Sequence, residues 1–469
     1  MLITSVAAYF LVTIGIGLWA AKRVHNSKDY LVAGRSLPLY MNMAVVFATW
    51  FGAETVLSVS ATFSRDGLGG IVADPFGASF CLFFVALFFA RAFYRMDLLT
   101  IGDFYRKRYS KPVEVITSVA ITASYLGWTS AQLTALGLVF SVLSGGAIDL
   151  NTGILIGAVI VLGYTIWGGM WSVALTDLFQ TVIILIGLAA VAFLVGGMAG
   201  GPAKVIAAAA EAGKFEFWPK GGAKEWLWFL GAWMTLAIGS IPQQDVFQRV
   251  TSAKDERTAV RGSLFGGLAY LGFAFVPMFI AYSALVIDPG FAGLFTSEDD
   301  REIQRILPNL VLERTPMWAQ VLFFGALLSA ILSTSAGALL APTALFTENI
   351  VRPFAPRLGD KQFLLLLRIV LVLFTLAALL FALNSTSTMY EMVQNAYKVT
   401  LVSCIVPLAA GIYWKRASGT GAMFSVLFGL LSWGIAELTA PEATVPPQLV
   451  GLAFSLLGMV LGSLVPKPK

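Results

Sequence analysis

The sequence predicts an all-α membrane protein with about thirteen transmembrane helices, and its composition and hydrophobic runs lead to that prediction. The 469 residues are 58% hydrophobic and only 12% charged, whereas a water-soluble domain carries roughly 25% charged residues. The mean hydropathy is +0.81. Nearly charge-free stretches, such as 2–20 and 364–383, approach or reach the roughly 20 residues that cross a bilayer as a helix.

Apolar runs separated by polar connections place the expected spans along the chain. The first run starts directly at the N-terminus, without a basic region or a cleavage site, so we expect a retained helix and not a signal peptide. The spans are expected near residues 2–20, 38–62, 70–94, 113–142, 150–168, 174–198, 225–247, 260–286, 316–340, 363–383, 390–413, 419–437 and 448–465.

Basic residues gather in alternate connections, which predicts the orientation of the chain. Examples are Arg106-Lys-Arg108 after the third span and Arg249, Lys254, Arg257 and Arg261 after the seventh. The positive-inside rule places these connections in the cytoplasm, with the N-terminus outside and the C-terminus inside. The formal charge of +5 therefore reflects topology. We expect a multi-pass protein in the lipid bilayer of the plasma or inner cell membrane, and no nucleic-acid partner.

Two spans carry helix-breaking residues near their middle. The second contains Gly52 and the acid Glu54, and the seventh contains Pro242 within a polar stretch. Interrupted helices at matching places in two halves are typical of inverted-repeat transporters. Alternatively, Gly52 and Pro242 only kink packed helices. We expect one transporter domain over 1–469, with an extra span in 1–37, repeats in 38–198 and 225–413, and two further spans in 414–469.

Ionisable residues within the spans are candidates for function, because a charge at membrane depth costs several kcal/mol unless it is paired. Acids outnumber bases among them, which favours a cation as part of the cargo. Asp177 and Asp245 could instead lie in solvent at the cytoplasmic ends of their spans. The candidates are Glu54, Asp74, Asp177, Asp245, Glu391 and Lys398.

The ninth span offers adjacent hydroxyls at Ser333 and Thr334, with the Ala330 carbonyl one turn earlier. Sodium is a hard cation, and hard cations are bound by oxygen ligands. An unwound backbone around 48–51 could supply further carbonyl oxygens. Alternatively, the two hydroxyls bond only to carbonyls of their own helix.

Four stretches in this order resemble the sodium:solute symporter family over nearly the whole chain. They are Asp29-Tyr-Leu-Val-Ala-Gly-Arg-Ser36, Trp167-Gly-Gly-Met-Trp-Ser-Val-Ala-Leu-Thr-Asp177 with Gln180, Pro242 leading to Phe247-Gln-Arg249, and Ala330-Ile-Leu-Ser-Thr running on to Thr347-Glu-Asn-Ile350. The resemblance implies a five-plus-five inverted repeat of the leucine-transporter type, with one extra N-terminal and two extra C-terminal helices. It also implies symport coupled to Na⁺.

The resemblance further implies a sodium site built from five residues. The Ala48, Phe51 and Ala330 carbonyls and the Ser333 and Thr334 hydroxyls match its ligands. Asp177 matches an acid near that site, and Arg35 matches a basic residue placed to form an inner-gate ion pair. Some members hold a second sodium with hydroxyls where this chain has Ala336 and Gly337, so we expect one sodium per substrate.

Within the family the chain is most similar to the high-affinity choline transporter branch, on Ala48-Thr-Trp-Phe-Gly52 and Pro75-Phe-Gly77 among other stretches. Aromatic faces bind quaternary ammonium groups, and Trp50 and Trp128 match tryptophans able to line such a cage. Gln243 replaces a further tryptophan, Asp74 replaces a neutral residue, and Lys398 adds a cation.

The expected small-molecule substrate is therefore a zwitterionic or cationic amine, amino-acid-like or choline-like, with a sugar or carboxylate as the alternative. Its expected site comprises Trp50, Glu54, Asp74, Trp128, Gln243 and Lys398, the lysine being long enough to reach Glu54 or Asp74.

Other classes of function fit less well. The sequence has no HExxH zinc motif, no nucleophile turn and no Gly-rich phosphate loop, so we expect neither a membrane enzyme nor ATP-driven transport. A transporter-like membrane sensor would normally carry a cytoplasmic signalling domain, whereas this chain ends at Lys469 soon after its last span. We expect the transporter to act as a monomer or a weak oligomer.

Overall fold

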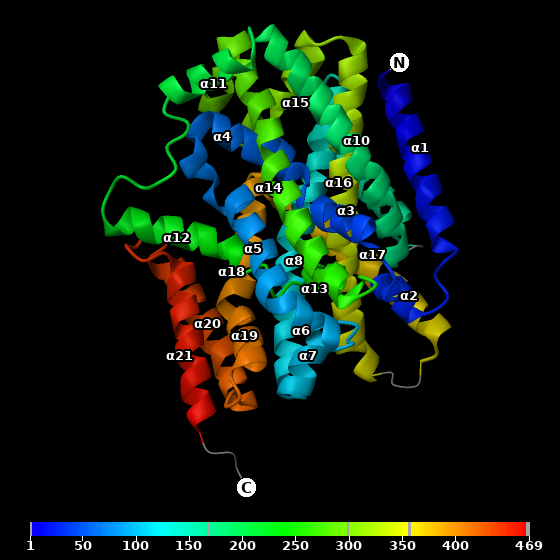
Figure 1. Ribbon diagram of the computed structural model, residues 1–469, viewed down its shortest axis with the longest axis vertical. Coiled ribbons are helices and arrows are strands. Elements are labelled where there is room, and N and C mark those ends of the chain that lie inside the picture. The colour runs from blue at the N-terminus through cyan, green and yellow to red at the C-terminus, as the bar shows by residue number, and fades with distance from the viewer. Residues whose placement is uncertain (1, 167–168, 298–299, 355–357, 466–469) are drawn as a thin grey trace.

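The computed structural model describes residues 2–166, 169–297, 300–354 and 358–465. Within these ranges the chain forms helices and no β-strand, apart from one isolated bridge between Leu37 and Ala253 (Figure 1). The predicted all-α class is confirmed. Trp167 and Gly168 of the second matched stretch lie outside the described residues.

The helices follow the predicted spans closely. The longer ones are α1 (Leu2–Ala21), α3 (Leu39–Trp50), α8 (Lys111–Leu143), α9 (Leu150–Thr165), α10 (Gly169–Met198), α12 (Ala223–Ala237), α14 (Glu256–Ile287), α16 (Met317–Phe346), α17 (Asp360–Asn384), α18 (Met389–Ser403), α20 (Gly419–Thr439) and α21 (Pro447–Leu464). The shorter ones are α2 (Ser27–Val32), α4 (Ser60–Asp66), α5 (Ala78–Phe84), α6 (Ala90–Arg95), α7 (Ile101–Arg108), α11 (Pro202–Glu211), α13 (Gln244–Thr251), α15 (Ile306–Arg314) and α19 (Ile405–Tyr413).

By length and apolar composition, 8 helices of the described chain could cross a membrane, or up to 10 if two bent pairs each count as one span. The shorter apolar helices Ala7–Ala21 and Leu150–Gly163 and the α12–α13 pair coincide with the remaining expected spans. The multi-pass architecture is confirmed, whereas the count of thirteen stays a prediction. α1 begins at one end of the molecule and α21 ends at the other (Figure 1).

Both predicted helix breaks are present. α3 ends at Trp50, and the chain bends by 56° before it continues as a helix from Glu54. α12 ends at Ala237 and α13 begins at Gln244. Proline has no amide hydrogen and disfavours helix in the residue before it, so Pro242 accounts for part of the second gap. Each break frees backbone groups from intrahelical bonding.

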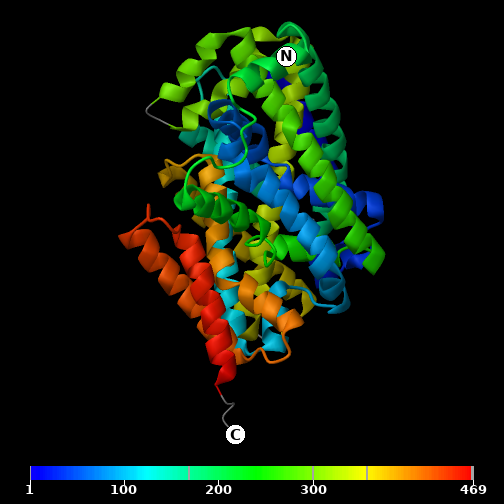
Figure 2. The same cartoon turned by 60° about the vertical axis from the view of Figure 1, so that its left-hand side comes forward.

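The two breaks lie beside the most buried helices. In α8 and in the span that begins with α16, 83% of the apolar stretch is buried inside the protein, compared with 28% in α20 and 39% in α21. α20 and α21 pack against each other at one edge, drawn in red and orange (Figure 1 and Figure 2). Glu54, Ser333 and Thr334, which the sequence singled out, gather around the interior faces of α3, α8 and α16.

Candidate functional site

Oxygen atoms of the second, sixth and ninth spans meet at the first helix break. The hydroxyls of Ser333 and Thr334 on α16 both donate to the Ala48 carbonyl at 3.2 Å. Ser333 also donates to Oδ1 of Asp177 on α10 at 2.5 Å. All four residues are at most 1% exposed. Ala330 and Phe51, the other two predicted ligands, are fully buried as well.

The neighbouring Ser335 shows the alternative behaviour of a membrane hydroxyl. It donates to the Ile331 carbonyl of its own helix at 2.6 Å. Ser333 and Thr334 reach across to another helix instead. The Oδ2 atom of Asp177 is buried without a hydrogen-bond partner among the described residues. Because Asp177 is buried, its placement in solvent is wrong. Its Oδ2 atom remains available as a further oxygen close to the hydroxyls of Ser333 and Thr334.

A second polar group surrounds Glu54, which is 4% exposed. Gln132 on α8 donates to its Oε2 atom at 2.6 Å, and the Trp128 indole donates to Oε1 at 3.4 Å. Gln132 also accepts from the Ala53 backbone amide at 3.3 Å. Trp128 and Gln132 are four residues apart, so they share one face of α8.

The third span brings Asp74 to the same region. Asp74 is 3% exposed, accepts a short hydrogen bond from the Tyr270 hydroxyl on α14, and lies 3.5 Å from the Thr55 hydroxyl. The Tyr270 ring centroid is 6.5 Å from that of Trp50. The carboxyl groups of Glu54 and Asp74 thus have only neutral partners among the residues described here.

A series of aromatic contacts connects these two acids. Trp50 on α3 stacks with Tyr397 on α18 at 6.1 Å between centroids, and Trp128 lies 6.2 Å from the same tyrosine. Trp50, Trp128 and Tyr397 are between 2% and 6% exposed. Such spacings are typical of interacting aromatic pairs. We call Trp50, Glu54, Asp74, Trp128, Tyr270 and Tyr397 the central cluster.

Gln243 lies at the second break, directly before α13. Its amide donates to the Ser124 hydroxyl on α8 at 3.0 Å and to the Thr400 hydroxyl on α18 at 3.3 Å. Two residues further on, Asp245 is fully buried and accepts a short hydrogen bond from Tyr125. The placement of Asp245 in solvent is therefore wrong.

Lys398 does not reach the acids of the central cluster. Its ammonium lies 3.5 Å from the Glu437 carboxylate on α20. Consecutive residues of an α-helix point about 100° apart, so Lys398 points away when Tyr397 faces Trp50. The predicted contact with Glu54 or Asp74 is wrong. Glu391 is exposed and caps the start of α18 together with Thr388, so its placement at membrane depth is wrong too.

Arg35 forms an ion pair with Asp97, whereas its expected role at an inner gate stays a prediction. Its guanidinium donates to the Asp97 carboxylate, donates to the Tyr94 carbonyl at 2.6 Å, and lies 4.1 Å from the Tyr94 ring centroid. The hydrogen bond from Arg35 lowers the pKa of Asp97. This pair therefore contributes stability that is present at neutral pH and is lost as the pH falls through the lowered pKa.

Arg249 is the main interior residue that sequence reasoning assigned wrongly. It was counted with the cytoplasmic connections, but it is 2% exposed on α13. Its Nε donates to the Thr49 hydroxyl at 2.8 Å, and one guanidinium nitrogen lies 2.5 Å from where a Cβ would stand on Gly337. Arg249 follows the buried acid Asp245 by four residues on α13, so both side chains are on the same face of that helix.

Gln132, Tyr270 and Tyr397 were also missed. The four-residue spacing from Trp128 could have indicated Gln132. Tyr270 and Tyr397 lie in apolar spans without a local signal, and only the packing of α14 and α18 brings them to the second span.

Comparison with known proteins agrees with this geometry. The model of the "Sodium:solute symporter family" matches residues 30–429. High affinity choline transporter 1 of Homo sapiens is 26% identical over 438 residues, covering 91% of this chain and 75% of the relative. The sodium/glucose cotransporter of Vibrio parahaemolyticus is 25% identical over 461 residues, covering 90% and 82%.

Solved structures share the fold. The substrate-bound outward-open state of a Na⁺-coupled sialic acid symporter has a TM-score of 0.84 at 17% identity, covering 100% of this chain and 98% of that one. MhsT in complex with L-phenylalanine has a TM-score of 0.58 at 14% identity, covering 90% and 97%. The relatives named above are transporters and not enzymes, and the chain itself belongs to the sodium:solute symporter family.

Proposed function

We propose that this protein imports a small organic cation, an amine or quaternary ammonium compound, together with sodium. The observation that carries the proposal is the central cluster, in which two buried carboxyl groups flank aromatic rings. A desolvated cation–π contact contributes about 2 kcal/mol, and a carboxylate adds direct charge pairing. A cationic substrate would supply the positive charge that Glu54 and Asp74 lack.

The position of Lys398 favours a cation over the other substrate classes. A cationic side chain is a strong partner for the negative group of a zwitterion or a carboxylate. Lys398 is engaged with Glu437, and Arg249 lies beside Thr49 and Gly337. A sugar would require polar groups, but not two uncompensated acids. Among these substrate classes, an organic cation best complements the two carboxyl groups of Glu54 and Asp74.

Sodium is proposed to bind where Ala48, Phe51, Ala330, Ser333 and Thr334 place their oxygens, with Asp177 positioning Ser333. The ion would hold the broken segment of the second span in one conformation. That segment also carries Trp50 and Glu54, so an ordered segment presents the ring and the carboxylate to the substrate. We expect the two breaks to head inverted repeats over 38–198 and 225–413, which would move relative to each other during alternating access.

Uptake into proteoliposomes tests this function. Labelled choline and butylamine should accumulate under an inward sodium gradient and not under a potassium gradient. Labelled alanine, glucose and pyruvate represent the zwitterion, sugar and carboxylate alternatives. The Asp74→Asn variant should lose amine uptake while keeping the thermal stabilisation that sodium produces.

Sodium-driven uptake of glucose or pyruvate without uptake of the amines would contradict the substrate class. Sodium-dependent binding of an amine without uptake under any gradient would instead favour a sensor.

A further inference from the structure

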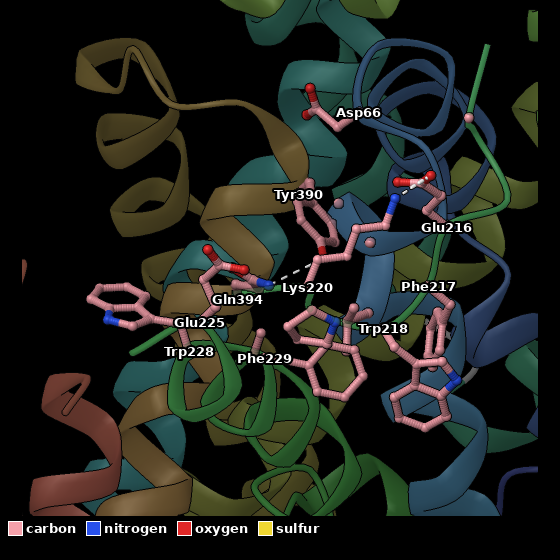
Figure 3. A pocket seen from close by; sticks show the side chains of 16 residues that line it. Asp66, Glu216, Phe217, Trp218, Lys220, Glu225, Trp228, Phe229, Tyr390 and Gln394 are labelled. Atoms are coloured by element: carbon pink, nitrogen blue, oxygen red, sulfur yellow. Dashed lines mark hydrogen bonds and ion pairs between the residues drawn. The ribbon is translucent and has the colours of Figure 1, made fainter. Parts of the chain in front are cut away.

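A cavity lies away from the central cluster, at the predicted extracellular end. It has a volume of about 580 Å³ and is lined by α4, the 212–222 connection, α12 and α18 (Figure 3). This connection is bound to the start of the third span, Leu68–Arg95, by backbone hydrogen bonds, from the Leu68 amide to the Lys214 carbonyl at 2.8 Å and from the Gly69 amide to the Glu216 carbonyl at 3.1 Å. Backbone hydrogen bonds therefore hold the wall that the 212–222 connection contributes to the cavity. We call it the outer cavity.

The lining of the outer cavity combines acids with aromatic rings. Its ionisable side chains are Asp66, Glu216, Glu225 and Lys220, which amounts to three acids against one base. Asp66 pairs with Arg65. Glu225 accepts from the Gly221 backbone amide at 2.8 Å, and no basic side chain pairs with it in the described parts of the chain.

The rings come from two directions. Trp218 and Phe229 lie 5.5 Å apart between centroids, on the connection and on α12 respectively. Tyr390 enters from α18, where Gln394 donates to its hydroxyl at 3.1 Å. Acids beside aromatic faces are the chemistry that recognises an organic cation.

Lys220 indicates how such a cation would sit. Figure 3 shows its side chain extending along the cavity to the Glu216 carboxylate, with which it forms an ion pair. Both side chains are exposed, at 72% and 56%. An ion pair this exposed contributes little to stability, so an amine from solution could take the place of the lysine ammonium at Glu216.

One helix face connects the outer cavity with the central cluster. Tyr390 and Gln394 line the cavity, and Tyr397 stacks on Trp50 in the cluster. These residues follow the spacing i, i+4, i+7 on α18, so they share a face. Seven residues of helix span about 10 Å. The third span also connects the two regions, because Val72 lines the cavity and Asp74, two residues later, belongs to the central cluster.

We propose that the outer cavity is a second binding site for organic cations, which captures the substrate before it enters the central cluster. This rests on the proposed substrate class. Glu216 and Glu225 supply the charges, Trp218, Phe229 and Tyr390 supply the faces, and Lys220 is the ion that the substrate displaces. Sodium is bound elsewhere, so binding here should not depend on sodium.

Calorimetric titration of the full chain with choline and with butylamine, in sodium and in potassium, tests the second site. The wild type should bind in two events, of which only one requires sodium. Glu54→Gln/Asp74→Asn should keep the sodium-independent event. Glu216→Gln/Glu225→Gln should weaken that event by about tenfold or more, as expected for losing charge-assisted contacts, and should keep the sodium-dependent one.

Glu211→Gln is the matched control, because Glu211 is exposed at the end of α11 and does not line the cavity. Sodium-induced thermal stabilisation checks that each variant is folded. A single sodium-dependent event that Glu54→Gln/Asp74→Asn abolishes would overturn the second site and leave the proposed function intact. A single sodium-independent event lost in Glu216→Gln/Glu225→Gln would support the second site and overturn the central one. No binding of either probe would overturn both.

Discussion

Gly52 lies where the proposed sodium site and the central cluster touch. A Cβ at this position would stand 2.5 Å from Glu54 Oε2 and 2.8 Å from Thr334 Oγ1. Both distances are shorter than real Cβ contacts allow, so one of the two oxygens would have to move. The glycine at the break therefore allows a carboxylate and a sodium-site hydroxyl to approach the same backbone.

Gly52→Ala should accordingly weaken sodium and substrate binding together, each by about tenfold or more. Thermal shifts with sodium alone and with choline measure the two effects. Gly272→Ala is the control, because a Cβ there meets nothing within 4 Å. If Gly52→Ala changed only one of the two affinities, the shared boundary would be disproved.

Ser333 and Thr334 differ from Ser335 in where their hydroxyls donate. Ser333→Ala or Thr334→Ala should raise the sodium concentration needed for half-maximal uptake by about tenfold or more, because each removes one oxygen ligand. Ser335→Ala removes a bond within its own helix and should leave sodium dependence near that of the wild type. Wild-type sodium dependence in both of the first two variants would rule out the site.

At the scale of elements, different faces of α18 contact different parts of the protein. One face carries Tyr390 and Tyr397 toward the outer cavity and the central cluster. Lys398 points to α20, where Glu437 also accepts from the Trp433 indole at 3.1 Å. The lysine therefore connects α18 to the C-terminal pair of helices, α20 and α21.

Lys398→Ala should lower stability without removing the response to substrate. The pair is partly buried, at 17% and 37% exposure, so its loss should cost roughly 1–3 kcal/mol, between the values for exposed and buried pairs. Glu437→Gln should lower the melting temperature similarly, while choline-induced stabilisation persists in both variants. A selective loss of that stabilisation in Lys398→Ala would place the lysine back in the substrate site.

At the scale of the whole molecule, the buried charge of Arg249 bears on how many sodium ions accompany each substrate. Where some relatives are expected to hold a second sodium, this chain has Ala336 and Gly337, and the Arg249 guanidinium stands against Gly337. A fixed cation there opposes a second mobile one by simple repulsion. We therefore propose that Asp177, which accepts from Ser333, positions this hydroxyl at a single sodium site.

Transport should therefore couple one sodium to each substrate. The sodium dependence of uptake should have a Hill coefficient near one, and a monovalent cationic substrate should move two positive charges per cycle. Reversal potentials in proteoliposomes measure this ratio independently of the rate. A Hill coefficient clearly above one, with charge movement to match, would contradict the prediction.

Much of the architecture follows from the sequence alone. Apolar runs of span length can only be helices in a bilayer, because every backbone polar group must be bonded within the segment. Gly52 and Pro242 mark both breaks because they weaken helix locally. The hydroxyls of the ninth span and the acids Glu54 and Asp74 stand out because polar groups are costly at that depth.

The tertiary structure alone decided which of these groups meet. A span that is apolar all round carries no stripe to reveal its inward face, so the directions of Lys398, Tyr270 and Tyr397 depend on helix rotation and packing. The burial of Arg249 depends on where α13 ends within the bundle, since basic residues next to a span otherwise suggest the cytoplasm. Local sequence determined the helices and their breaks, whereas contacts between distant helices determined the charge balance around the central cluster.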